Sequence, residues 1–143
     1  MQFSHVLVIC RGNICRSPMA EALLANTLGG RITVSSAGTQ ALVDHPAAEQ
    51  AVSLLGRRGL DISQHRARQL TASLAREADL LLIVEQALRA HVLEITPAAR
   101  GKLYRLGEWR NIDIDDPYGQ PESVFAECLS LIDQTVSDWG SRL

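Results

Sequence analysis

The stretch His5-Val6-Leu7-Val8-Ile9-Cys10-Arg11-Gly12-Asn13-Ile14-Cys15-Arg16-Ser17-Pro18 opens this chain and sets its fold. The apolar run that ends on Cys10 predicts a buried strand. Gly12 and Asn13 follow, and these residue types most easily adopt a positive φ, so a tight loop is expected. Ser17 is a preferred N-cap residue and Pro18 a preferred first helical residue. The stretch is therefore predicted to be a strand, a tight loop and the start of a helix.

The loop has the composition of an anion-binding site. When such a loop curls, its backbone N–H groups turn inward and form a nest for an anion. Arg16 adds a planar fork with two donors, suited to a phosphate. A positive field at the base of the loop favours the thiolate form of Cys10, which is the nucleophilic form. The pattern therefore predicts a phosphatase-type site in which Cys10 is the nucleophile and Arg16 holds the phosphate.

Other interpretations of the loop are weaker. A buried cysteine before an ordinary turn would not explain the neighbouring residues. No C-x2-C pair and no nearby histidine completes a tetrahedral set with Cys10 and Cys15, so no metal is expected. A nucleotide-binding protein would carry G-x4-G-K-[ST] or G-x-G-x-x-G after the first strand, and neither occurs.

Length and composition indicate one globular domain over residues 1–143, with 46% apolar and 21% charged residues. A net charge of −2 gives no electrostatic reason to expect nucleic acid or a membrane as a partner. No segment resembles a signal peptide or reaches a membrane-spanning length, so no membrane insertion is expected. The odd number of cysteines, three, and the need to keep a nucleophilic thiol reduced both favour the cytoplasm.

Strands and helices alternate along the chain, which predicts a parallel sheet with helices on both faces. Strands are expected at residues 5–10, 31–35, 79–84 and 102–106. Helices are expected at residues 18–28, 46–58, 86–95 and 121–140, with a short helix that Thr71 caps and that ends at Glu77. Residues 107–120 are expected to form a loop. The last helix is expected to bury Val124, Cys128, Leu131, Ile132, Val136 and Trp139.

The residues from Cys10 to Pro18 closely resemble the active-site loop of the low-molecular-weight protein tyrosine phosphatases. Asp116-Pro117-Tyr118 resembles a second hallmark of that family. Ser36-Ala37-Gly38-Thr39 and His65-Arg66-Ala67-Arg68 resemble further family segments, so the resemblance covers nearly the whole chain. The string SAGTQALV at residues 36–43 looks most like the bacterial branch, whose members act with tyrosine kinases that control capsule and exopolysaccharide export.

The resemblance implies both a fold and an activity. The fold is a single-domain, three-layer α/β/α structure with a four-stranded parallel sheet in the order 2-1-3-4. The first strand then ends at the switch point where open α/β sheets bind ligands. The activity is hydrolysis of phosphotyrosine through a phosphocysteine, without a cofactor. The enzyme is expected to be a monomer, and its partner a tyrosine-phosphorylated protein, in particular a membrane-associated tyrosine kinase.

The resemblance also assigns roles to residues outside the nucleophile. Asp116 matches the family's general acid; Asp115 is the neighbouring alternative, and the position before Pro117 favours Asp116. Asp113 is expected to be a solvated loop charge. Leu42 and Tyr118 are expected to wall the cleft.

Within the loop, the predicted phosphate-binding residues are Arg11, Gly12, Asn13, Ile14, Cys15 and Ser17. Ser17 has two compatible roles, because its hydroxyl can cap the helix and can also stabilise the Cys10 thiolate. Asn13 is expected to be left-handed, with its amide tied to neighbours for which the resemblance suggests Ser36 and His65.

The two remaining cysteines leave alternatives open. In the family, the cysteine that matches Cys15 can form a disulfide with the nucleophile and shield it from irreversible oxidation; a packed thiol is the alternative. Cys128 is expected to lie in the core. Arsenate reductases of the same fold relay electrons through two further cysteines, but no cysteine lies between Cys15 and Cys128. A non-catalytic phosphotyrosine-binding module would not need both Cys10 and Asp116.

Overall fold

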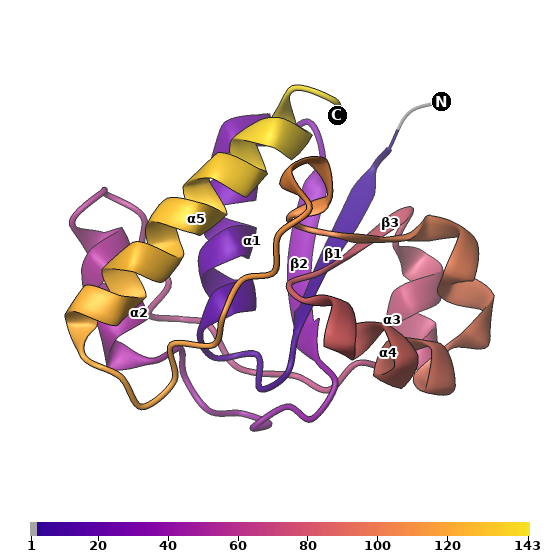
Figure 1. The fold of residues 1–143 in the computed structure, drawn as a ribbon, viewed down its shortest axis with the longest axis horizontal. Coiled ribbons are helices and arrows are strands. Elements are labelled where there is room, and N and C mark those ends of the chain that lie inside the picture. Colours follow the sequence, from indigo (N-terminus) through magenta and orange to yellow (C-terminus); the bar gives the residue numbers. More distant parts are fainter. Residues whose placement is uncertain (1–2) are drawn as a thin grey trace.

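Four parallel strands form the central sheet of the computed structural model, which describes residues 3–143 (Figure 1). Met1 and Gln2, which the predicted domain included, lie outside the described residues. The strands are β1 (His5–Cys10), β2 (Thr33–Gly38), β3 (Leu80–Ile83) and β4 (Leu103–Arg105). Their spatial order is β2-β1-β3-β4, which confirms the predicted order 2-1-3-4.

The helices cover both faces of the sheet, as predicted. They are α1 (Arg16–Leu28), α2 (Glu49–Gly56), α3 (Ala72–Glu77), α4 (Arg89–Ile95) and α5 (Glu122–Gly140). In Figure 1, α1, α2 and α5 lie on one side of the sheet, and α3 and α4 on the other. Since both faces are covered, the central strands β1, after His5, and β3 are continuous apolar runs. No helix in residues 3–143 has the length and apolarity to span a bilayer.

The pairing register brings the ends of the strands together. Cys10, the last residue of β1, lies opposite Gly38, the last residue of β2. Ile9 lies opposite Ile83, the last residue of β3. Any chemistry carried by the segments that follow β1, β2 and β3 is therefore concentrated at one edge of the sheet.

The first strand and the short helix after Thr71 match their predicted bounds, and several other bounds differ. The second strand runs from Thr33 to Gly38 rather than over residues 31–35, because Arg31 still belongs to the turn after α1, where its N–H bonds to the carbonyl of Leu28 at 3.2 Å. The second helix begins at Glu49 rather than residue 46, because the N–H of Ala48 bonds to Ile14 of the tight loop at 2.8 Å.

Short 3₁₀ helices account for further differences in secondary structure. The predicted helix 86–95 is split into a 3₁₀ turn at Gln86–Leu88 and α4. Two further 3₁₀ helices, Pro97–Lys102 and Glu108–Arg110, lie where none was predicted. The fourth strand is thereby shortened to three residues.

The buried face of α5 differs in part from the predicted one. Leu131, predicted to be buried, is 37% exposed, and Val124 is only partly buried. The buried positions are Phe125, Cys128, Leu129, Ile132, Thr135, Val136 and Trp139. These positions recur at spacings of three and four residues, which is the period of one helix face. Thr135 joins that face because its hydroxyl donates to the carbonyl of Ile132 at 3.0 Å.

Gly38 allows the closest approach between β2 and the tight loop. A Cβ atom at this position would lie 2.4 Å from the carbonyl oxygen of Arg11 and 3.1 Å from the amide nitrogen of Asn13. Both atoms belong to backbone, so they cannot move aside as the end of a flexible side chain could. Gly38 is therefore required by space and not by its φ angle.

We expect Gly38→Ala to lower the free energy of unfolding by about 1–3 kcal/mol, the usual cost of forcing an extra methyl group into a packed site. Urea unfolding followed by circular dichroism measures the change. Gly56→Ala is the control, since a Cβ at Gly56 would meet nothing within 4 Å. Equal unfolding midpoints for both variants and the unmodified protein would contradict the steric argument.

Candidate active site

The loop between β1 and α1 turns its carbonyl groups away from its own centre. The carbonyls of Cys10, Arg11 and Gly12 accept hydrogen bonds from the N–H groups of residues 39, 40 and 42 at 3.0, 2.9 and 3.1 Å. Because the N–H and C=O of a peptide unit point in opposite directions, the N–H groups that follow these carbonyls point inward. Asn13 N–H shows this directly, since it donates to Cys10 Sγ at 3.2 Å. The predicted nest of inward N–H groups is thus formed.

Asn13 holds the loop in shape from its centre. It is fully buried and left-handed, with a φ of 60°. Its Nδ2 donates to Ser17 Oγ at 2.8 Å and to Ser36 Oγ at 3.0 Å, and its Oδ1 accepts from the N–H of Arg68 at 2.9 Å. His65 Nε2 donates to the backbone carbonyl of Asn13 at 2.7 Å. Ser36 and His65 therefore lie where predicted, although His65 bonds to the backbone and not to the side-chain amide.

Two expectations about this loop are wrong. Gly12 does not take a positive φ; Asn13 alone supplies the left-handed turn. Ser17 is not the N-cap, because α1 begins at Arg16 and Cys15 occupies the cap position without a side-chain cap. The Ser17 hydroxyl instead lies 2.8 Å from Cys10 Sγ.

The hydrogen bonds around Cys10 suit a thiolate. Cys10 is 2% exposed, and the Asn13 N–H and the Ser17 hydroxyl both reach its sulfur. Since Ser17 Oγ already accepts from Asn13 Nδ2, its own proton is available to point at the sulfur. Donors aimed at a sulfur atom stabilise its negative charge. Of the two roles considered for Ser17, the geometry therefore supports stabilisation of the Cys10 thiolate.

Arg16 is buried beside the same loop and is surrounded by acceptors. Its Nη1 donates to the carboxylate of Glu85 and, at 2.8 Å, to the carbonyl of Ile114, while its Nη2 lies 3.8 Å from Asp116 Oδ2. Burial on its own would lower the pKa of Arg16, but the charge of Cys10, the hydrogen bond to Glu85 and the Asp116 carboxylate together raise that pKa above its ordinary value. Arg16 is therefore a permanent cation at the loop.

Glu85 was missed by the sequence reasoning. It follows the buried strand β3 with one residue, Val84, between them, and β3 pairs directly with β1. An acidic residue just beyond the end of a buried parallel strand, next to the strand that carries Cys10, is the signal that could have found it.

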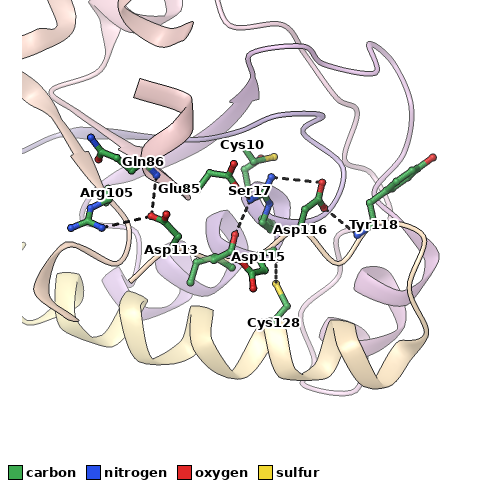
Figure 2. Close-up of polar contacts among 12 residues, drawn as sticks. Cys10, Ser17, Glu85, Gln86, Arg105, Asp113, Asp115, Asp116, Tyr118 and Cys128 are labelled. Carbon is green, nitrogen blue, oxygen red and sulfur yellow. Dashed lines mark hydrogen bonds and ion pairs between the residues drawn. The ribbon is translucent and has the colours of Figure 1, made fainter. Parts of the chain in front are cut away.

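The segment around Asp116 is fastened at several points, which Figure 2 shows. Ile114 N–H donates to the carbonyl of Val84 at 2.9 Å. Cys128 Sγ lies 3.8 Å from the carbonyl oxygen of Asp115. Asp113 is exposed, as expected of a solvated loop charge, and its carboxylate also accepts from the N–H of Gln86 at 2.9 Å and lies 3.7 Å from the Arg105 guanidinium. These contacts fix the backbone from which Asp116 extends.

A cavity of about 320 Å³ opens above the loop. It is lined by Arg11, Gly12, Ile14, Cys15, Arg16, Gln40, Leu42, Asp116 and Tyr118. Leu42 and Tyr118 therefore lie at the cavity as predicted, and Asp116 lines it whereas Asp115 does not. Gln40 was not predicted; its Oε1 accepts from Arg11 Nε at 2.9 Å at the rim.

The other two cysteines are buried thiols. Burial raises the pKa of Cys15 to about 12, and the Asp116 carboxylate adds to the rise. Burial likewise raises the pKa of Cys128 to about 12. Both residues are therefore neutral at pH 7. Cys128 belongs to the core, as predicted, and the disulfide between Cys10 and Cys15 stays a prediction, since all three cysteines are free.

Comparison with known proteins identifies what this arrangement resembles. The family described as "Low molecular weight phosphotyrosine protein phosphatase" matches residues 5–143. A probable low molecular weight protein-tyrosine-phosphatase, EpsP, from Ralstonia nicotianae is 46% identical over 96% of this chain and 94% of its own length.

Two solved structures have similar folds. Wzb from Vibrio vulnificus, in complex with benzylphosphonate, has a TM-score of 0.96 and 36% identity, and the match covers 99% of this chain and 100% of that one. The tyrosine phosphatase Wzb from Escherichia coli K30, in complex with sulphate, has a TM-score of 0.94 and 39% identity, with 99% of each chain covered.

We expect Glu85→Ala to destabilise the protein, because it leaves the buried Arg16 cation without its hydrogen-bonded carboxylate partner. Removing one partner of a fully buried pair costs about 3–5 kcal/mol; since Glu85 is partly exposed to solvent, we expect about 1–3 kcal/mol. Urea unfolding measures this loss in the free energy of unfolding. The control is Glu94→Ala, at an exposed glutamate of α4, which should change the free energy of unfolding by less than about 0.5 kcal/mol. If both variants were equally stable, Glu85 would not be the residue that neutralises Arg16.

Proposed function

The chain belongs to the low molecular weight phosphotyrosine protein phosphatase family, and we propose that it hydrolyses phosphotyrosine in proteins through a phosphocysteine on Cys10. One observation carries the roles of the residues. Cys10 Sγ lies inside a loop of inward N–H groups, with the cation of Arg16 and the carboxyl group of Asp116 beside the same cavity.

In the first step, the Cys10 thiolate attacks phosphorus, so that a P–S bond forms while the P–O bond to the tyrosyl oxygen breaks. The non-bridging oxygens take up charge against the inward N–H groups of the loop and the Arg16 guanidinium. Asp116, in its acid form, gives its proton to the departing tyrosyl oxygen. Splitting one displacement into two in this way is covalent catalysis.

In the second step, water attacks the phosphocysteine. The Asp116 carboxylate left by the first step takes a proton from that water, a new P–O bond forms and the P–S bond breaks. Cys10 leaves as a thiolate, whose charge the Ser17 hydroxyl and the Asn13 N–H stabilise. Phosphate is released, and both Cys10 and Asp116 regain their starting protonation states.

The shape of the cavity supports an aryl phosphate as the substrate. Leu42 and Tyr118 provide apolar surface above a recessed anion site, so a phosphoryl group must be carried on a long, flat side chain to reach the sulfur. A phosphoserine side chain would be too short. The Vibrio vulnificus relative was solved with benzylphosphonate, which combines an aromatic ring with a phosphonate.

The finer proposals concern the setting of the reaction. We propose a single catalytic domain that works as a monomer in the cytoplasm, without metal or cofactor, on a tyrosine-phosphorylated protein, in particular a tyrosine kinase of a polysaccharide export system. The proposal rests on the bacterial-type segment at residues 36–43 and on the likeness to EpsP. An arsenate reductase is the less favoured alternative, since no relay cysteine lies between Cys15 and Cys128.

We expect Cys10→Ser to lose the hydrolysis of aryl phosphates by several orders of magnitude, because a serine hydroxyl in this loop is a far weaker nucleophile than a thiolate. Inorganic phosphate should still bind, since the N–H groups and Arg16 remain. Steady-state kinetics and calorimetric phosphate titration measure the two effects, and a chelator should change neither. Substantial turnover by Cys10→Ser would refute the thiolate mechanism.

Asp116→Asn should slow the hydrolysis of phenyl phosphate by roughly 10²–10⁴-fold, the usual contribution of general acid catalysis. The loss should shrink for a substrate with a very good leaving group, such as dinitrophenyl phosphate, because that oxygen needs no proton. Asp115→Asn is the matched control and should have a much milder effect. A larger loss in Asp115→Asn than in Asp116→Asn would show that the acid has been assigned to the wrong neighbour.

A further inference from the structure

Residues 39–42, here called the wall segment, form one side of the cavity and carry Gln40 and Leu42. Three of the four amide groups of this segment bond to carbonyls of the phosphate-binding loop: those of Thr39, Gln40 and Leu42. The amide of Ala41 does not, because it points to the opposite side. The wall segment therefore needs a second partner on the side that faces away from the loop.

The side chain of Gln69 is that partner. Its Oε1 accepts from the N–H of Ala41 at 3.0 Å, and its Nε2 donates to the carbonyl of Thr39 at 2.9 Å and to its neighbour Leu70 at 3.3 Å. An N–H group can only donate and a carbonyl can only accept, so these partners fix the positions of Oε1 and Nε2 in the Gln69 amide.

The side-chain amide continues a ladder that the backbone begins. Gly38 and Gln69 form an isolated parallel bridge, in which Gly38 N–H donates to the carbonyl of Arg68 at 3.0 Å and Leu70 N–H donates to the carbonyl of Gly38 at 2.8 Å. Beyond Gly38 the two backbones no longer pair. There the Gln69 amide offers a C=O and an N–H to Ala41 and Thr39, as a further peptide group would.

We propose that Gln69 is a positioning residue that sets the specificity of the cleft for an aryl group. It does not line the cavity, so it acts through the wall segment. Thr39 is buried and Ala41 is partly buried, so without the Gln69 amide their polar groups would lack partners, and the Ala41 peptide would shift outward to reach water. The three wall amides that bond to the loop carbonyls do not bond to Gln69 and would keep those bonds. The shift of the Ala41 peptide would move Leu42 and Gln40 away from an aromatic ring seated above the loop.

The phosphate site itself does not depend on Gln69 in this way. The shape of the loop is held by Asn13, which is bonded to Ser17, Ser36 and His65, and its cation is held by Glu85. Losing the Gln69 amide should therefore weaken recognition of the aryl group and spare recognition of the phosphate. A residue needed only for folding would affect both.

This inference rests on the proposed function, and one set of measurements separates the two. We compare the unmodified protein with Gln69→Leu and Gln69→Met, which keep the approximate volume and remove both polar atoms. The substrate is phosphotyrosine, and inorganic phosphate serves as the competitive inhibitor. Gln64→Leu, at an exposed glutamine of the same connecting segment, is the matched control.

We expect both Gln69 variants to raise the KM for phosphotyrosine by about five- to twenty-fold, a loss consistent with two neutral hydrogen bonds. The inhibition constant of inorganic phosphate should stay within about two-fold of the unmodified value, and any fall in kcat should be smaller than the rise in KM. Gln64→Leu should change none of these quantities.

An unchanged KM in the two Gln69 variants would overturn the proposal. A parallel rise in the KM and in the inhibition constant of phosphate would also overturn it, because Gln69 would then support the whole loop. Failure of the unmodified protein to hydrolyse phosphotyrosine would instead overturn the proposed function, and with it this inference.

Discussion

The active site depends on how one buried guanidinium is neutralised. Arg16 is 2% exposed, and burying its charge without partners would cost far more than a folded protein of this size can tolerate. Its partners come from two other parts of the chain: Glu85 just beyond β3, and the segment of Ile114 and Asp116 before α5. The requirement to satisfy this cation therefore draws the end of the sheet, the phosphate-binding loop and the acid-bearing segment into one place.

A second constraint acts on the backbone of the loop. Its N–H groups can face an anion only if its carbonyls are satisfied elsewhere, and the wall segment supplies the donors for three of them. The anion site and the aryl-binding wall are consequently two sides of one hydrogen-bonded unit. Because Gly38 has no side chain, β2 and the phosphate-binding loop approach closely enough for these bonds to form.

Local patterns in the sequence predicted the parts of the structure that local interactions decide. The strand at residues 5–10, the helix capped by Thr71 and the left-handed Asn13 follow from apolar runs and intrinsic preferences. The family resemblance, and not periodicity, gave the strand order. The bounds of β2 and α2 were wrong because pairing with β1 and a bond to Ile14 decide them, and neither is visible in a window of sequence. Glu85 and Gln69 were missed for the same reason, since each acquires its role from a partner at least 28 residues away.

The bonds that hold Asn13 have a consequence for the newly made chain. The segments that shape the surroundings of Cys10 lie far beyond it in the sequence. They carry Ser36 in β2, His65 and Arg68 after α2, and Glu85 after β3. A chain that has left the ribosome only as far as α1 therefore carries Cys10 as an ordinary cysteine, without the ordered donors that stabilise its charge. The donors and the cation around Cys10 can therefore be held in place only after the chain has been made through Glu85.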